Sequence, residues 1–280
     1  MLGTALLQLK RAQAQQAPRH VLLERPAAGQ PHKGKVLLVI QPHWDDVPHS
    51  TAGTVAKLIQ EGYTGYLVRG TNDDPEICRI LGLKGNFDLN YPNHRTGDVS
   101  INEFIWRLTF LIRCLKVDTV IAHEPWGIGE ENPDHYTLAR GVEMACCRAG
   151  RAHDYPEQFA AGLKPHAVRE KYYYARQTSI TRAVDISGVI DRKIEANRAD
   201  VAKGPAGHAG SCTRADLAKK GLRLPLAGDD DATADRNYVR ECQLTRNREL
   251  GRQYGVEYAE AFHYVGSGRS FLPADIEVDS

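Results

Sequence analysis

The chain lacks the features that mark membrane-spanning proteins, zinc fingers and nucleic-acid-binding arms. No apolar run reaches the roughly 18–20 residues that a membrane span requires. The six cysteines form no C-x-x-C pair, so neither a zinc finger nor a thioredoxin-like site is indicated. Lys and Arg number 36 and Asp and Glu number 35, and the net charge of +1 argues against nucleic acid as a partner. What remains is globular composition, with 42% hydrophobic and 25% charged residues over 280 positions.

The cysteines and the N-terminus leave the cellular compartment open. Cys114, Cys146 and Cys147 fall in helical patterns, where small buried thiols are expected, although an even number of cysteines permits disulfides. A short apolar stretch over residues 2–9 precedes Ala12-Gln13-Ala14, which is similar to a small-residue cleavage site. This segment is either the remnant of an export signal or an extension of the domain. A soluble, cytoplasmic protein is favoured, and a homo-oligomer stays open.

Alternating strand and helix patterns predict an α/β fold. The run 36–40 contains no polar residue, which is typical of a strand buried on both faces of a parallel sheet. Ser100 and Glu103 fit a capping box at the start of a long amphipathic helix. The order of the elements predicts a doubly wound, mostly parallel sheet, in which ligands bind beyond the carboxyl ends of the strands.

The predicted elements cover most of the chain. Strands are predicted at 36–40, 63–68 and 118–122, and extended segments at 171–176 and 183–186. Helices are predicted at 50–60, 101–115, 135–147, 187–200 and 236–254. Gly, Pro, Ala and Asp are frequent over 203–235, which predicts a loop or lid. The predicted organisation is an N-terminal extension over 1–33 and one domain over 34–280, with a core over 34–200 and a C-terminal loop and helix over 201–280.

The densest chemical signal is Pro42-His43-Trp44-Asp45-Asp46, directly after the first buried strand. His43 offers an imidazole and Asp46 a carboxylate, a ligand mix that suits Zn²⁺. Asp45 is adjacent to Asp46, so its side chain points elsewhere, which suits a base beside a metal-bound water. The alternative is that Asp45 and Asp46 only cap the following helix and His43 is a polar loop residue.

A second cluster, Glu131-Asn132-Pro133-Asp134-His135, follows the strand predicted at 118–122. In a parallel sheet it returns to the same carboxyl edge. His135 is therefore expected to complete a three-ligand site with one position open for water, as catalytic zinc requires. Asp134 has two expected roles, a carboxylate that orients a ligand imidazole or an N-cap for the helix.

Together the two clusters resemble the LmbE/PIG-L family of zinc-dependent de-N-acetylases. That family's pattern is a strand, H-P-D-D, a small-residue turn into G-G-T, and later H-P-D-H. The resemblance is carried by the two clusters and by Ala52-Gly53-Thr54 between them, and it extends from about Val36 to Arg176. It continues more weakly through Lys193-Ile194-Glu195-Ala196 and Ala259-Glu260-Ala261-Phe262. The segment between Asp74 and Leu81 is shorter than the one that the family usually has after its second strand.

The resemblance implies a Rossmann-like fold that removes an acetyl group from an N-acetylglucosamine-type amino-sugar conjugate. It implies that His43, Asp46 and His135 bind zinc and that Asp45 is the general base. Trp44 stands where the family has Pro, and Asn132 stands where it has the first His of H-P-D-H. The second departure leaves the general acid open. The candidates are Asn132 itself, His263, His94 and His123.

Residues on the predicted loops at the same edge are candidates for binding a sugar. Stacking candidates are the aromatic residues Trp44, Tyr91 and Trp126, and hydrogen-bonding candidates are Arg69, Asn72, Asp73, Asn93 and Arg95. Three rival functions stand beside this one. A metal-dependent hydrolase of another amide or an ester has the same zinc site, and Asn132 keeps an inactive sugar-binding relative open. A nucleotide-binding protein is disfavoured, because paired carboxylates stand where a G-x-G-x-x-G turn is needed.

Overall fold

A nine-stranded sheet forms the centre of the molecule in this computed structural model, which describes residues 21–70, 75–92, 94–126, 130–174, 180–200, 207–266 and 276–278. The strands follow the order β4-β3-β2-β5-β6-β8-β7-β1-β9 across the sheet. Their bounds are β1 Leu22–Glu24, β2 Val36–Gln41, β3 Thr64–Arg69, β4 Gly85–Asp88, β5 Thr119–His123, β6 Glu170–Tyr174, β7 Arg182–Asp185, β8 Ala259–Val265 and β9 Ile276–Val278.

Most of the described strands run parallel. β2 lies between β3 and β5, and its Leu38 stands opposite Tyr66 and Val120. β8 runs antiparallel to β6 and β7, and β9 runs antiparallel to β1. The predicted fold class, an α/β protein with a mostly parallel sheet, is confirmed. Because β2, β5 and β6 run in the same direction, their carboxyl ends share one edge of the sheet.

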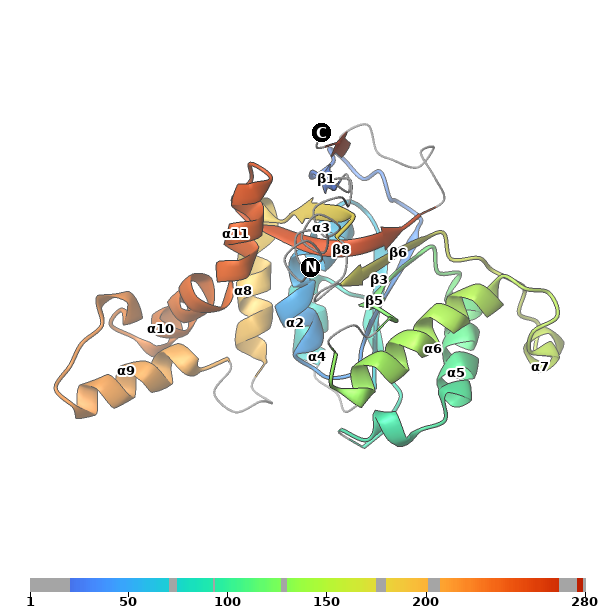
Figure 1. The fold of residues 1–280 in the computed structure, drawn as a ribbon, viewed down its shortest axis with the longest axis horizontal. Helices are drawn as coiled ribbons and strands as arrows, with labels where there is room; N and C mark the ends of the chain where they lie inside the picture. Colours follow the sequence, from blue (N-terminus) through green and yellow to red (C-terminus); the bar gives the residue numbers. More distant parts are fainter. Residues whose placement is uncertain are drawn as a thin grey trace, which may run out of the picture.

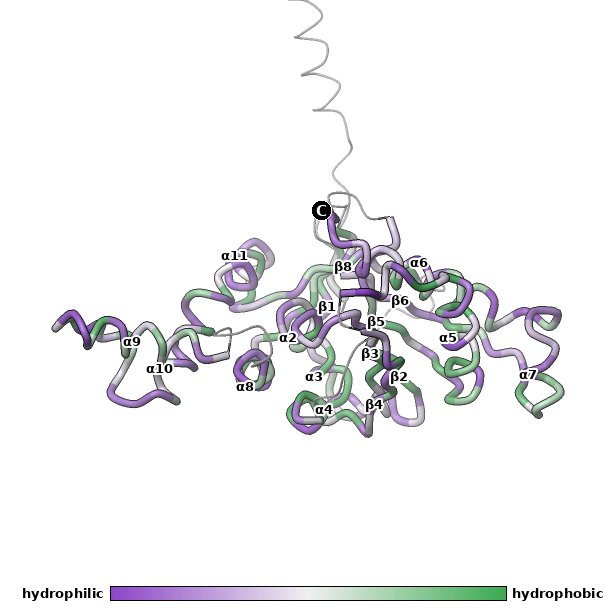
Figure 2. Tube along the Cα trace, turned by 90° about the horizontal axis from the view of Figure 1, so that it is seen from below, coloured by the Kyte–Doolittle hydropathy of each residue, from purple (hydrophilic) through white to green (hydrophobic). Residues whose placement is uncertain are grey.

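Helices cover both faces of the sheet. α5 (Ile101–Leu115) and α6 (Pro133–Ala149) pack against each other on one face. α3 (Ala52–Gln60), α4 (Pro75–Leu81) and α8 (Ile190–Ala199) pack together on the other. Figures 1 and 2 show the two layers on opposite sides of the strands. This is the doubly wound arrangement that the alternation of elements predicts.

The residues of β2 alternate between two hydrophobic cores. Leu37 and Val39 are buried in the cluster that includes residues of α3, α4 and α8. Leu38 and Ile40 are buried in the cluster that includes residues of α5 and α6. Successive side chains of a strand point to opposite faces, so a strand covered on both sides contains only apolar residues. This explains why the central strand was the easiest element to predict.

The C-terminal part contains helices where a loop was predicted. Residues 203–235 include α9 (Ala209–Lys219) and the first turn of α10 (Asp231–Tyr238), so the predicted loop or lid is wrong there. The Asp230 side chain caps α10 by accepting the Thr233 N–H at 2.8 Å. The acidic run that suggested a loop is therefore a helix-start signal. In Figure 1, α9 and α10 project away from the sheet.

Short elements escaped the sequence patterns because periodicity needs longer windows. β1 lies inside the predicted extension over 1–33, yet it pairs with β7 and β9 in the sheet. The remaining short elements, and the two that join α10 to β8, are α2 Asp46–Ser50, η1 Thr96–Asp98, α7 Pro156–Ala160, η2 Ser187–Val189, η3 Pro225–Ala227, η4 Val239–Gln243 and α11 Thr245–Gln253.

Two local predictions are wrong. The Ser100 side chain makes no capping bond at the start of α5, and the Glu103 carboxylate instead accepts a 2.8 Å hydrogen bond from the Tyr91 hydroxyl. Of the three cysteines expected to be buried, Cys146 is buried but Cys114 and Cys147 are exposed. Within the described part of the chain, no helix has the length and apolar character needed to cross a membrane.

Candidate metal centre

The first part of the centre is the tight turn from β2 into α2. Pro42 follows the strand, and its lack of an N–H is tolerated because the ladder ends there. The Asp46 side chain folds back, and its Oδ2 accepts the His43 backbone N–H at 2.8 Å. Gln41 Oε1 accepts the Val47 N–H at 2.9 Å, which closes the turn from the other side. These bonds place His43 and Asp46 together, buried at the carboxyl end of β2.

The second part is the start of α6. Asn132 is its N-cap, with Oδ1 accepting the Asp134 N–H at 3.0 Å, and Pro133 occupies the first helical position. The expectation that Asp134 is the N-cap is therefore wrong. Instead, Asp134 Oδ1 accepts the Gly97 N–H at 2.7 Å, and its Oδ2 lies 3.0 Å from His43 Nε2. The Asp134 carboxylate thus holds the outer nitrogen of the His43 imidazole.

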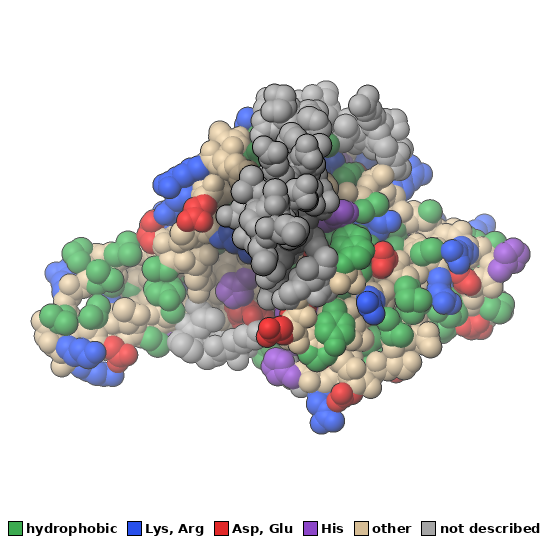
Figure 3. Space-filling model, viewed as in Figure 1, with side chains coloured by type: hydrophobic (Ala, Val, Ile, Leu, Met, Phe, Trp, Pro, Cys, Tyr) green, Lys and Arg blue, Asp and Glu red, His purple; other side chains and the backbone are tan. Residues whose placement is uncertain are grey.

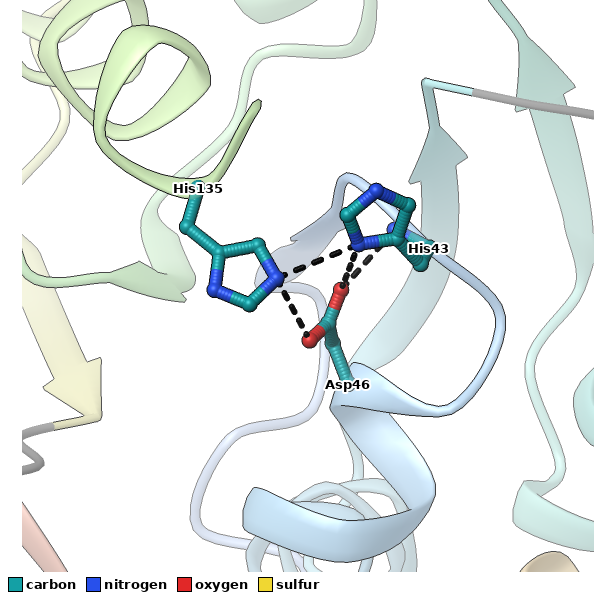
Figure 4. A group of neighbouring side chains, drawn as sticks. All are labelled: His43, Asp46 and His135. Atoms are coloured by element: carbon teal, nitrogen blue, oxygen red, sulfur yellow. Dashed lines mark hydrogen bonds and ion pairs between the residues drawn. The ribbon is translucent and has the colours of Figure 1, made fainter. Parts of the chain in front are cut away.

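His43, Asp46 and His135 converge on one point, as Figure 4 shows. His43 Nδ1 lies 3.1 Å from His135 Nε2. The two carboxylate oxygens of Asp46 face these nitrogens, with Oδ2 3.4 Å from His43 Nδ1 and Oδ1 3.4 Å from His135 Nε2. Figure 3 shows histidine and acidic side chains close together near the middle of the visible face. The turn after β2 and the start of α6 therefore build a single site.

The charges of the cluster are divided among its members. Burial favours the neutral Asp46 acid, but hydrogen bonds from His123 and His43 outweigh it and hold the pKa of Asp46 well below its usual value. Burial lowers the pKa of His43, yet Asp46 and Asp134 outweigh burial and raise it overall. Burial dominates at His135, where the nearby His123 adds to it and the pKa is lowered. The cluster thus favours the carboxylate form of Asp46, and the pKa values of His43 and His135 shift in opposite directions.

The donor set of the cluster fits a metal cation. Asp134 holds the outer nitrogen of His43, and Glu130 Oε2 lies 2.9 Å from the outer Nδ1 of His135. These carboxylates favour protons on the outer nitrogens, which leaves both inner lone pairs facing each other. Two lone pairs at this separation need a proton or a cation between them. The cluster is therefore a possible metal site of two imidazoles and one carboxylate.

A buried ion pair from distant parts of the chain holds the ligand-bearing turn. Lys193 on α8 donates to the carbonyl oxygens of Pro48 and His49 and to Glu260 Oε1, at 3.1, 2.9 and 2.7 Å. On β8, Glu260 also accepts the Gly53 and Thr54 N–H groups at the start of α3, at 3.0 and 2.7 Å. The pair thereby ties the end of α2 to the start of α3.

Gly53 explains the small-residue turn that follows the first motif. A Cβ at this position would lie 2.7 Å from the Ile186 side chain, closer than packed carbons come. The glycine lets α3 approach η2 and lets its N–H reach Glu260. The small residues after the first motif are thus required by packing against the C-terminal half of the chain.

The other predicted site residues are spread around this centre. Asp45 is buried, and its carboxylate lies in a second group with His49 and Asp200. His263 on β8 packs its ring against Trp126 at 4.7 Å, and Trp126 is 43% exposed. Arg69 is buried at the end of β3, Trp44 is half-buried, and the exposed Arg95 pairs with Asp98. The predicted substrate residues Asn72, Asp73 and Asn93 lie outside the described residues.

The sequence alone did not predict the roles of two residues that lie at the centre. Glu130 carried no motif, although it stands two residues before the N-cap and contacts His135. His123 was considered only as a general acid, whereas its Nε2 lies 3.2 Å from Asp46 Oδ1. His94, another candidate acid, is exposed and lies 4.9 Å from the His43 ring. The position of His123 at the end of β5 was the available signal, because parallel strands place their ends at one edge.

Three solved structures share this fold. N,N'-diacetylchitobiose deacetylase from Pyrococcus horikoshii matches with a TM-score of 0.62 and 22% identity, over 83% of this chain and 84% of that one. A conserved protein from Thermus thermophilus matches at 0.57 and 25%, over 83% and 98%. GalB, the 4-carboxy-2-hydroxymuconate hydratase from Pseudomonas putida KT2440, matches at 0.59 and 16%, over 86% and 100%. No family model matches the chain.

These similarities establish the fold of the chain. They do not identify its reaction, which depends on the side chains at the site. A deacetylase and a hydratase match this chain with TM-scores of 0.62 and 0.59, so the similarity of the backbones does not choose between them. The choice depends on which side chains stand at the carboxyl edge of the sheet.

Proposed function

We propose that the chain is a zinc-dependent hydrolase that removes the N-acetyl group from an N-acetylglucosamine-type amino-sugar conjugate, giving acetate and a free amine. The observation that carries the proposal is the convergence of His43, Asp46 and His135 at the carboxyl edge of the sheet. A deacetylase is among the solved structures of this fold, so the fold is compatible with this reaction. The resemblance of the two ligand segments to the LmbE/PIG-L motifs supports it independently of the backbone. The proposed unit is a single domain that includes residues 34–280 together with β1, which is paired in the same sheet.

His43, Asp46 and His135 are the proposed zinc ligands, because two imidazoles and a carboxylate leave a position open on a tetrahedral ion. A bound zinc ion would supply a water of lowered pKa and polarise the acetyl carbonyl. Asp45 is the proposed general base that accepts the proton of this water. Asp45 precedes Asp46 in the turn after β2, and its buried carboxylate lies beside His49 and Asp200.

Substrate binding is assigned to the side chains that are expected from the sequence at this edge of the sheet. The exposed Trp126 indole, supported by Tyr173 and His263, is the proposed stacking surface for a sugar ring. Arg69 and Arg95 are proposed to donate hydrogen bonds to sugar hydroxyls, and Trp44 to line the opposite wall. Asn72 and Asp73 complete the proposed set. The leaving amine takes its proton from Asp45 after Asp45 has received it, or from His263.

The test combines metal analysis with a deacetylation screen over N-acetylglucosamine conjugates. We expect about one zinc per chain and acetate release that a chelator abolishes. His135→Ala should lower zinc content and acetate release together, whereas His153→Ala, an exposed histidine far along the chain, should change neither. Full zinc occupancy in a variant lacking all three proposed ligands would refute the metal assignment. Zinc binding without acetate release, but with release of another acyl group, would move the substrate to a different amide or ester.

A further inference from the structure

Each of the three proposed ligands contacts a second side chain that is not itself a proposed ligand. For His43 this side chain is Asp134, which the sequence already suggested as an orienting carboxylate. For His135 it is Glu130, and for Asp46 it is His123. Neither of these two belongs to the motifs that identified the ligands, so their contribution comes from the structure.

Glu130 connects the backbone at the helix start to the ligand imidazole. Its Oε1 accepts the Asn132 N–H at 3.0 Å, and its Oε2 lies 2.9 Å from His135 Nδ1. The backbone bond at Oε1 thus fixes the Glu130 carboxylate, and its Oε2 is left to contact the His135 imidazole. A proton held on Nδ1 leaves the lone pair on Nε2, which is the nitrogen that faces His43 and Asp46. Glu130 therefore selects the tautomer that binds a metal at the cluster.

His123 stands behind the carboxylate ligand. It is the last residue of β5, it is buried, and its Nε2 lies 3.2 Å from Asp46 Oδ1. Its ring is held between Tyr174, at 4.2 Å, and His135, at 4.3 Å. The two imidazole planes differ by only 20°, so the rings stack face to face. The contact between Nε2 and Asp46 Oδ1 places His123 directly against the carboxylate ligand.

We propose that Glu130 and His123 are positioning residues that set the metal affinity of the site. Glu130 fixes the tautomer and the direction of His135, and His123 fixes the rotation of the Asp46 carboxylate. The proposal depends on the metal ligands of the proposed function but not on the substrate or the reaction. Outer partners of this kind are worth about 10–100-fold in metal affinity in characterised sites. The same range is expected for each of these two residues.

The experiment measures zinc affinity of the purified full chain by competition with a chromophoric chelator. Glu130→Ala and His123→Ala should each weaken zinc binding by about 10–100-fold. His123→Gln keeps an N–H donor and should recover part of the loss. Glu131→Ala, which removes an exposed carboxylate from the same segment, and His153→Ala are matched controls and should bind zinc as the unaltered chain does.

Glu130→Gln separates hydrogen bonding from charge and covers the case in which Glu130→Ala fails to fold. The amide oxygen can still accept the Nδ1 proton and keep the tautomer, but the NH₂ that replaces Oε1 cannot accept the Asn132 N–H. We expect the visible absorption of the cobalt-substituted variant to shift relative to the unaltered chain, because the ligand field at His135 changes. The lost backbone bond should lower thermal stability in excess chelator only slightly, and a merely structural role would not shift the cobalt absorption.

The outcomes separate this proposal from the proposed function. Equal zinc affinity in the unaltered chain, Glu130→Ala and His123→Ala, all folded, would overturn it even if the chain deacetylates sugars. Tenfold weaker binding in both variants would support it even if no acetylated sugar is a substrate. If the unaltered chain binds no zinc, cobalt or manganese, the positioning roles and the metal assignment are overturned together.

Discussion

The buried ion pair between Lys193 and Glu260 should be among the strongest single contributions to stability. Both side chains are fully buried, and their Nζ and Oε1 atoms lie 2.7 Å apart. Removing one partner of such a pair leaves an uncompensated buried charge, which costs about 3–5 kcal/mol. We expect a loss of this size for Lys193→Met. Glu260→Gln should lose as much, because the Gly53 and Thr54 N–H groups bond to different carboxylate oxygens and the single amide oxygen cannot accept both in the same way.

A double-mutant cycle isolates the pair itself. Lys193→Met and Glu260→Gln combined should cost less than the sum of the two single losses, because the second substitution removes the charge that the first left unpaired. A coupling free energy of about 1–3 kcal/mol is expected for directly contacting buried partners. Urea unfolding in excess chelator gives the free energies, provided that the slope with denaturant is unchanged across the four proteins.

An exposed pair on α9 serves as the control for this cycle. Lys219 and Asp216 lie 2.9 Å apart, but their side chains are 76% and 67% exposed. Breaking this pair should leave the unfolding midpoint unchanged, because solvent screens exposed charges. The reasoning is refuted if both buried variants unfold within about 1 kcal/mol of the unaltered chain, as about ±0.5 kcal/mol is typical of surface changes.

Two further predictions follow from the buried carboxylates. Asp45→Asn should keep zinc but lower turnover by about 10²–10⁴-fold, because an amide cannot accept a proton; near-normal acetate release with full metal content would move the base elsewhere. Burial alone raises the pKa of Glu24, but Lys57 and Arg182 outweigh burial and lower it from 4.5 to about 2. The group therefore stabilises the fold above pH 4.5, by about 3 kcal/mol, and this contribution is lost as the pH falls towards 2. Acid titrations of Glu24→Gln followed by circular dichroism should show a flatter loss of stability over that range, and identical curves would contradict the assignment.

The sequence predicted those parts of the site that are local along the chain. His43 and Asp46 lie three residues apart just after an apolar run, and that run predicts a strand buried on both faces of the sheet. The rule that parallel strands share a carboxyl edge then brought His135 to the same place. Each of these steps needs only spacing and strand order, which a single sequence contains.

The residues that escaped prediction acquire their roles through packing. Lys193 and Glu260 are charged residues in ordinary-looking segments, and they are buried only because they meet each other across 67 positions of the chain. Glu130 contacts the proposed ligand His135 from a segment without a motif, and His123 contacts the proposed ligand Asp46 from the end of a predicted strand. Residues 209–219 have weak amphipathic character, because their helix projects from the body and buries little of its surface, so composition favoured a loop there. Lys193, Glu260 and His123 thus meet partners from distant parts of the chain, whereas Glu130 meets His135 only five residues away.

The asparagine at the start of α6 determines how the leaving amine can gain its proton. The Asn132 Oδ1 is engaged in capping the helix that carries His135, and an amide is too weak an acid to protonate an amine. Two routes remain. Asp45 can return the proton that it took from water, as microscopic reversibility allows, or His263 can donate one from β8. His263 packs on the exposed Trp126 indole, which places it beside the proposed sugar platform.

The pH–rate profile of His263→Ala distinguishes the two routes. A histidine that donates the proton produces a falling limb on the alkaline side, because the neutral imidazole has no proton to give to the amine. Its removal should then erase that limb and lower kcat about 10²-fold or more. We expect instead that kcat and the profile survive, since Asp45, as the proposed base, would already carry the proton taken from water, while His263 packs against Trp126. A raised KM with an unchanged kcat would then show His263 supporting the sugar platform. Loss of the alkaline limb would refute the single-carboxylate route and make His263 the acid that replaces the missing histidine at position 132.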